Sequence, residues 1–127
     1  MRFMMLMFPG PKAEAGVMPD DKSVAAMMKY NEELVNSGVM LSGDGLHPSS
    51  KGARVRYAGG KPSVSDGPFT ESKELIGGFA VMDLEGFDEV IAMSKRYAEI
   101  LGGTLEVDVR VVEEIEGLPT APEAPAS

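Results

Sequence analysis

The 127-residue chain contains no cysteine and only one histidine, His47. Without cysteine the protein cannot form disulfides, zinc–thiolate sites or iron–sulfur clusters, and it has no thiol nucleophile. Basic residues are also in the minority, because 12 Lys and Arg stand against 20 Asp and Glu and leave a formal net charge of −8. A field of that sign repels phosphate backbones, so we expect no nucleic-acid partner.

The chain also lacks a hydrophobic run long enough to cross a membrane. Residues 1–8 are apolar apart from Arg2, but Pro9-Gly10-Pro11 ends this run far short of the roughly 20 residues that a spanning helix needs. No small-residue cleavage site follows at the distance typical of a signal peptide. We therefore expect no membrane partner and a cytoplasmic location, with which the missing cysteines agree.

The composition that is present is typical of one globular domain. The mass is 13.5 kDa, and 43% of the residues are hydrophobic while 25% are charged. Such values favour a folded domain over a disordered chain. The end of the sequence is rich in proline and alanine. We predict a single domain over residues 1–116, followed by a disordered tail over residues 117–127.

Apolar patterning predicts four strands of a main sheet. Residues 1–8 form a continuous apolar run, whereas residues 105–111 alternate between valine or leucine and charged side chains. The first pattern is typical of a strand covered on both faces, and the second of a strand with one face in water. The four predicted strands cover residues 1–8, 39–46, 76–83 and 105–111.

Two amphipathic helices and a hairpin lie between these strands. One helix begins after Pro19-Asp20-Asp21 and ends at Gly38, with an apolar stripe formed by Val24, Met27, Met28, Leu34 and Val35. The second helix covers residues 87–101, and its stripe consists of Phe87, Val90, Ile91, Tyr97, Ala98 and Leu101. Residues 54–65 alternate around Gly59-Gly60 and predict a hairpin, which Pro62 keeps at an edge or outside the main sheet.

The order of these elements predicts an α+β protein with a ferredoxin-like βαββαβ plait and an inserted β-hairpin. Two right-handed split βαβ units give a four-stranded antiparallel sheet with two helices on one face. The first strand is then central, yet it is apolar on both of its faces. A bare apolar sheet face is unusual in a soluble monomer, so we expect a homodimer joined sheet to sheet.

Two residues are candidates for acid–base chemistry. His47 follows a predicted strand end and is the only possible imidazole base. The alternative is that His47 is an exposed loop histidine next to a proline. Asp66 begins a D-G-P turn, where its carboxylate either caps backbone N–H groups or lies at the edge of a cleft and binds a proton or a cation. The sequence leaves both alternatives open for each residue.

Four further polar residues are candidates for ligand binding. Asp44 is placed to pair with His47 or simply to fill a G-D-G turn, and Arg54 either binds an anion or keeps a strand edge soluble. Lys73 and Glu74 form a local ion pair or contribute to the same site. No spacing of carboxylates and imidazole indicates a metal site, and we expect no cofactor.

The segment from Asp66 to Phe79, DGPFTESKELIGGF, resembles the signature of the YCII-related family, in the branch named for its D-G-P-F motif. Gly43, Gly45, Leu46 and Pro48 are similar to a second motif of the same branch. The resemblance extends over about residues 1–115 of the chain.

This resemblance implies a dimeric α/β-barrel of ferredoxin-like protomers and a small bacterial cytoplasmic protein. In the wider family a histidine and an aspartate line a cleft; Asp66 matches the aspartate of the motif, whereas His47 does not match the family's histidine. Related proteins linked to sigma factors imply a sensing or regulatory role.

Together these observations favour a homodimer that binds a small molecule or acts as a regulator. The polar groups of the predicted site come from Asp66, His47, Asp44, Arg54, Lys73 and Glu74. The alternative is a cofactor-independent acid–base enzyme, an isomerase, lyase or hydrolase of a small organic acid. In that case His47 or Asp66 is the base, and Arg54 or Lys73 binds the substrate anion. A purely structural module would need only the dimer.

Overall fold

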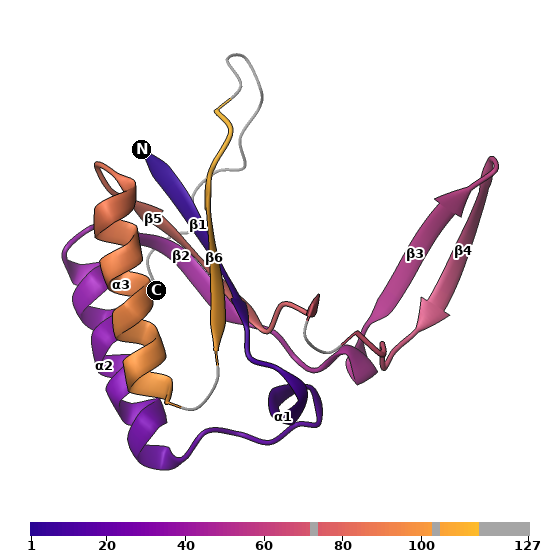
Figure 1. Ribbon diagram of the computed structural model, residues 1–127, viewed down its shortest axis with the longest axis horizontal. Coiled ribbons are helices and arrows are strands. Elements are labelled where there is room, and N and C mark those ends of the chain that lie inside the picture. Colours follow the sequence, from indigo (N-terminus) through magenta and orange to yellow (C-terminus); the bar gives the residue numbers. More distant parts are fainter. Residues whose placement is uncertain (72–73, 103–104, 115–127) are drawn as a thin grey trace.

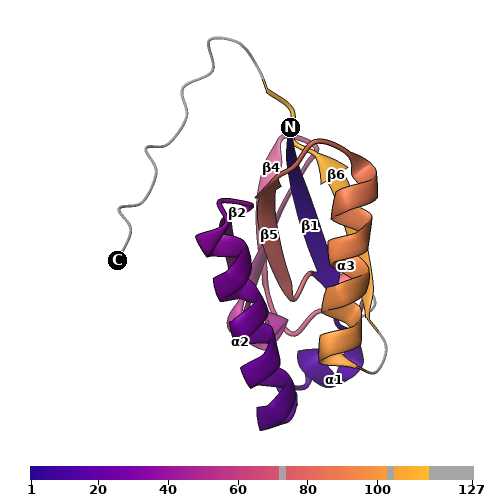
Figure 2. The ribbon, with the colours of Figure 1, turned by 90° about the vertical axis from the view of Figure 1, so that its left-hand side faces the viewer.

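The computed structural model describes residues 1–71, 74–102 and 105–114. Its elements in chain order are β1 (Arg2–Phe8), α1 (Pro11–Glu14), α2 (Asp21–Asn36), β2 (Met40–Gly45), the 3₁₀ turn η1 (Ser49–Lys51), β3 (Ala53–Ala58), β4 (Lys61–Asp66), β5 (Gly78–Asp83), α3 (Phe87–Leu101) and β6 (Glu106–Val111). The antiparallel main sheet has the order β2-β5-β1-β6, and α2 and α3 lie on one of its faces (Figure 2). The predicted α+β class and ferredoxin-like plait are confirmed.

The sequence did not predict the short helix α1, and the structure does not describe the predicted tail. Helix α1 has four residues and begins with Pro11, so it is too short to produce a helical hydrophobic period. The tail predicted over residues 117–127 lies outside the described residues.

The core lies between the sheet and its two helices. Phe3 and Met5 of β1 and Met82 of β5 are fully buried, and Val90 of α3 packs with them. The ring of Phe3 meets Phe87 edge to face, with 5.2 Å between the ring centroids. These contacts bury the odd-numbered side chains of β1, as expected for a strand whose residues alternate between two faces.

The predicted stripe on α2 is narrower in the structure. Leu34 is buried, and Met27 packs against the core, but Met28 and Val35 are 64% and 55% exposed. Each of these two residues follows a core-facing residue and is rotated by about 100° around the helix from it, which turns it toward solvent. Among the described residues, no helix combines the length and the apolar character that a membrane span requires.

The second face of the sheet is the one on which neither α2 nor α3 lies (Figure 1). Met4 pairs with Val81 and Leu6 with Phe79 across β1 and β5, and all four are half-buried. We call this surface the open face. At its β6 border, the charged side chains Glu106, Asp108 and Arg110 oppose Phe8, Leu6 and Met4 of β1.

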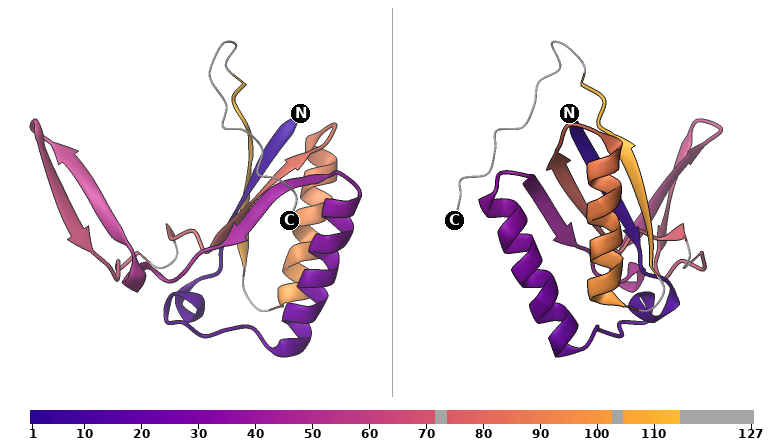
Figure 3. Two further views of the ribbon diagram at one scale, coloured as in Figure 1. Left: turned by 180° about the vertical axis from the view of Figure 1, so that it is seen from behind. Right: turned by 60° about the vertical axis from the view of Figure 1, so that its left-hand side comes forward.

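The inserted hairpin forms a separate two-stranded sheet, which we call the arm. Figure 1 shows that β3 and β4 project away from the main sheet, on the side opposite to α2 and α3, and the reverse view in Figure 3 agrees. The arm pairs Val55 with Val64 and Tyr57 with Pro62. Of the two predicted positions of this hairpin, at an edge of the main sheet or outside it, the structure has the second.

Candidate functional site

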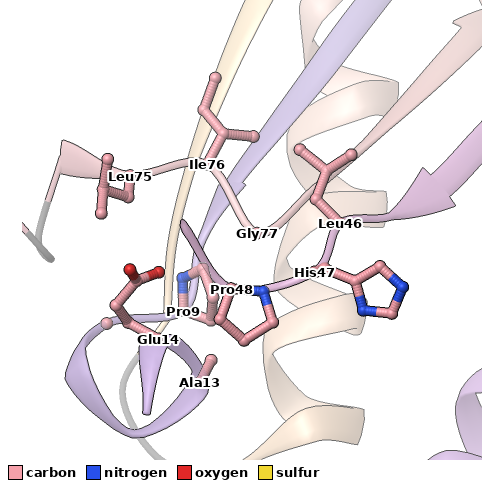
Figure 4. A pocket seen from close by; sticks show the side chains of 10 residues that line it. Pro9, Ala13, Glu14, Leu46, His47, Pro48, Leu75, Ile76 and Gly77 are labelled. Carbon is pink, nitrogen blue, oxygen red and sulfur yellow. The ribbon is translucent and has the colours of Figure 1, made fainter. Parts of the chain in front are cut away.

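A small cavity lies at the end of the sheet where β1 and β2 finish and β5 begins (Figure 4). Its volume is about 50 Å³. A water molecule needs about 10–15 Å³ measured in this way, so the cavity has room for a few atoms. It is lined by Pro9, Gly10, Ala13, Glu14, Leu46, His47, Pro48, Leu75, Ile76 and Gly77.

Gly77 fixes the inner wall of this cavity by allowing a close approach of the chain. Its N–H donates to the carbonyl of Met7 at 2.8 Å, and its carbonyl accepts from the N–H of Leu46 at 2.9 Å. A Cβ on Gly77 would come within 2.7 Å of Cδ of Pro9. Only glycine therefore lets Pro9 pack against the start of β5.

Glu14 is the carboxylate of the cavity, and Ser49 holds it in place. The backbone N–H of Ser49 donates to both carboxylate oxygens of Glu14 at 3.1 Å, and the hydroxyl of Ser49 also donates to Glu14. The same hydroxyl oxygen accepts a hydrogen bond from the N–H of Phe69 at 2.9 Å. This network joins α1, the turn η1 and the D-G-P-F segment, which lie far apart in the sequence.

The D-G-P-F segment packs closely on Ser49. The N–H of Gly67 donates to the carbonyl of Gly52 at 3.0 Å, and the peptide bond between Gly67 and Pro68 is cis. A Cβ on Gly67 would overlap the carbonyl oxygen of Ser49. The neighbouring backbone of Ser49 thus requires a glycine at this position of the motif.

Arg54 fastens the base of the arm to this segment. Its guanidinium carbon lies 4.1 Å from the centroid of the Phe69 ring, a distance that allows a cation–π interaction. Its Nη2 lies 3.4 Å from Oε2 of Glu71. A hydrogen bond from the backbone of Glu71 itself and the bond from Arg54 both lower the pKa of the Glu71 carboxyl. The structure thus gives Arg54 intramolecular partners.

The YCII-related domain model matches residues 1–116. The chain belongs to the YCII-related domain family. A relative from Rhizobium meliloti (strain 1021) is 26% identical over 91 residues, which are 72% of this chain and 73% of the relative, and it is itself described as an uncharacterised protein. Membership of the D-G-P-F branch within the family stays a prediction.

In this YCII-related protein the two predicted acid–base residues lie at different places. His47 lines the cavity, but its imidazole points away from Glu14 (Figure 4). Asp66 is exposed at the end of β4 and is not among the residues that line the cavity. The structure therefore does not bring His47 and Asp66 to one cavity.

The other predicted site residues are spread over the surface. Asp44 is exposed on β2 and pairs with Phe79 on the open face. Glu74 is exposed, and its N–H donates to the carbonyl of Glu71 at 2.8 Å. Lys73 lies outside the described residues. Among the described side chains, no three His, Asp or Glu residues gather as metal ligands would.

Glu14 is the site residue that sequence reasoning missed. Its partner Ser49 lies 35 positions away, and the helix that carries Glu14 has four residues. No local pattern could connect the two residues. The one available signal is the Pro9-Gly10-Pro11 break, which indicates a turn at this point of the chain.

Proposed function

We propose that this YCII-related protein binds a small molecule with a cationic or hydrogen-bond-donating group in the cavity beside Glu14. The observation that carries this proposal is a small cavity whose lining contains one carboxylate, Glu14, which Ser49 holds through its N–H and hydroxyl. An ionised carboxylate only accepts hydrogen bonds and has about four acceptor positions, so Glu14 can also bind a donor from a ligand. The net charge of −8 adds a general attraction for cations.

The cavity limits the size of the group that enters it. A volume of about 50 Å³ is well below the range of about 300–1,000 Å³ that is usual for sites of larger ligands. We therefore expect a small amine, or the amine end of a larger molecule, rather than a bulky metabolite enclosed as a whole.

Glu14→Gln tests this binding mode. The glutamine keeps one oxygen to accept from Ser49 but removes the negative charge, so an aliphatic amine should bind at least tenfold more weakly, as measured by NMR titration. Glu32→Gln is the matched control, because Glu32 is an exposed residue of α2. If the Glu14→Gln variant binds small amines as tightly as the Glu32→Gln variant does, the proposed site is wrong.

We also infer that the protein is a homodimer joined through the open face. The support is the half-buried row of Met4, Leu6, Phe79 and Val81, which a second copy would cover across a twofold axis. Sedimentation at micromolar concentration tests this inference. Leu6→Glu should shift the protein to monomer, and a wild-type protein that sediments as a monomer would contradict the proposal.

The arrangement favours binding over catalysis. The acid–base alternative has His47 or Asp66 as its base and would be supported by both residues facing one cavity, whereas Asp66 does not line the cavity that His47 lines. A sensing or regulatory role, with the link to sigma factors, a bacterial source and a cytoplasmic location, stays part of this proposal. We further propose that the folded unit covers residues 1–116, a span that the family match supports, with residues 117–127 as a tail.

A further inference from the structure

The arm has a strand edge without a partner among the described residues. Its two strands form a sheet of their own, and outside the hairpin no backbone hydrogen bond of the described chain involves Val55 or Tyr57 of β3. The side chains of these two residues are 68% and 72% exposed. An isolated two-stranded hairpin is only marginally stable in water, and an unpaired edge is a template for a further strand.

The turn of the hairpin determines which backbone groups of β3 face this edge. Both residues of the Gly59-Gly60 turn have positive φ, as in the two-residue turns whose flanking residues are hydrogen-bonded to each other. These flanking residues are Ala58 and Lys61. Because hydrogen-bonded and non-hydrogen-bonded pairs alternate along antiparallel strands, the N–H and C=O groups of Val55 and Tyr57 point away from β4.

The other edge of the arm is blocked by a proline. Pro62 of β4 pairs with Tyr57, so the backbone nitrogen of Pro62 also points outward, but it carries no hydrogen. Proline at such a position is one of the features that prevent a sheet edge from pairing. The arm can therefore accept a full strand only along β3.

Of the two edges of the main sheet, β6 is better suited to pairing than β2. The register of β2 is irregular between Met40 and Ser42, a feature that protects edges, whereas β6 pairs regularly with β1. The N–H of Val112 donates to the carbonyl of Arg2 at 2.9 Å, so these residues form a hydrogen-bonded pair. The alternation of pairs then leaves the backbone groups of Val107 pointing away from β1.

The side chains of β3 and β6 alternate in a complementary way. The apolar residues of each strand lie on one face, and the other face carries arginines in β3 and carboxylates in β6, namely Arg54, Arg56, Glu106 and Asp108. An antiparallel pairing with Val55 opposite Val107 places each arginine opposite one of these carboxylates. A shift by two residues toward the end of β6 would instead place Arg54 opposite Arg110. The backbone and the charges therefore favour the same register.

We propose that β3 of one copy adds as an antiparallel strand to the edge of β6 in a second copy. The arm then extends the main sheet of the second copy beyond β6. The arm projects to the side of its own main sheet opposite to α2 and α3 (Figure 1), where the second copy of the proposed homodimer lies, and a twofold axis repeats the contact. This inference rests on the proposed homodimer and assigns the arm a place in it.

Val55→Pro tests the strand addition. It removes an N–H that points away from β4, so the hairpin should stay paired, as it does at Pro62. The dimer dissociation constant, measured by sedimentation, should rise at least about tenfold, because each contact loses a hydrogen bond and leaves a carbonyl unpaired. Val64→Pro is the matched control, since Val64 faces Val55 but its N–H points to the blocked edge of β4. The control should dimerise within about threefold of wild type.

Introduced cysteines supply a second test, since the chain contains none. With Val55→Cys and Val107→Cys, the thiols lie on directly opposite residues, whose Cα atoms are about 5.5 Å apart in a hydrogen-bonded pair. This distance suits a disulfide, so oxidation should link the two copies covalently. With Val64→Cys and Val107→Cys, the first thiol lies one strand further away, by about 4.8 Å, and linkage should be at least about tenfold slower.

The results separate the strand addition from the homodimer. A wild-type protein that sediments as a monomer would contradict both. A wild-type dimer in which Val55→Pro dissociates no more than Val64→Pro, or in which the two cysteine pairs link equally fast, would overturn the strand addition alone. The edge of β3 would then be left for an extended strand of another protein.

Discussion

The contact between Gly67 and the carbonyl group of Ser49 makes Gly67→Ala a direct test of the D-G-P-F turn. A Cβ on Gly67 would overlap the carbonyl oxygen and lie 2.5 Å from the carbonyl carbon of Ser49, whereas real Cβ atoms stay at least 3.0 Å from such atoms. Both partners are backbone, so no change of rotamer relieves the overlap. Overpacking costs about 1–3 kcal/mol.

The required shift also weakens the hydrogen bonds of Ser49. The N–H of Phe69 donates to its hydroxyl at 2.9 Å, and a neutral bond of this kind contributes about 1 kcal/mol. We therefore expect Gly67→Ala to lower the free energy of unfolding by about 2–4 kcal/mol, as measured by urea denaturation at fixed protein concentration. Hydrogen exchange at the Phe69 amide should become faster.

Gly45→Ala is the matched control for this prediction. Gly45 ends β2, and no atom lies within 4 Å of the position that its Cβ would take. This change should alter the free energy of unfolding by less than about 0.5 kcal/mol. If Gly67→Ala unfolds at the urea concentration of the control and the Phe69 amide stays protected, the close packing of Gly67 on Ser49 is wrong.

Two further predictions concern the core. Burial raises the pKa of Tyr97 to about 12 from 10.0, so its contribution to stability is complete below pH 10 and is lost as the pH rises toward 12. Between pH 10 and pH 12 the free energy of unfolding should fall by up to about 1.4 kcal/mol per pH unit. In the Tyr97→Phe variant it should fall less steeply with pH, and an equal dependence on pH in the two proteins would contradict the burial of Tyr97. Phe3→Ala should lower the free energy of unfolding by about 3–5 kcal/mol. Phe87→Ala should lower the free energy of unfolding by less than half as much, because Phe87 is 48% exposed. If urea denaturation shows equal losses of stability for the two variants, the described core is wrong.

The main sheet was predictable because its strands have long and distinct patterns. The apolar run of β1 places Phe3 and Met5 in the core and Met4 and Leu6 on the open face, and the sequence shows both rows. The helices were harder to delimit. Met28 belongs to the predicted stripe of α2 but is exposed, since a residue at the border of a stripe depends on the tilt of the helix against its neighbours.

The candidate site was less predictable, because non-local contacts build it. The motif D-G-P-F draws attention to Asp66, yet the structure uses Gly67 and Phe69 of this motif to position Ser49. The carboxylate that enters the cavity belongs to Glu14, on a helix of four residues. Local patterns can find turns and stripes, but they cannot identify two side chains that meet across 35 positions.

Ser49 links the cavity to the arm, since each of its polar groups has a partner. Its N–H and hydroxyl bind Glu14 at the cavity, and its carbonyl accepts from the N–H of Gly52 at 2.9 Å, just before β3. Gly67, which follows β4, packs on the same carbonyl group. Both ends of the arm therefore meet at the residue that orients the carboxylate. Gly67→Ala should therefore disturb two sets of contacts. It should loosen the packing of Gly67 on Ser49 at the base of the arm, and it should weaken the hydrogen bonds that Ser49 donates to Glu14 at the cavity.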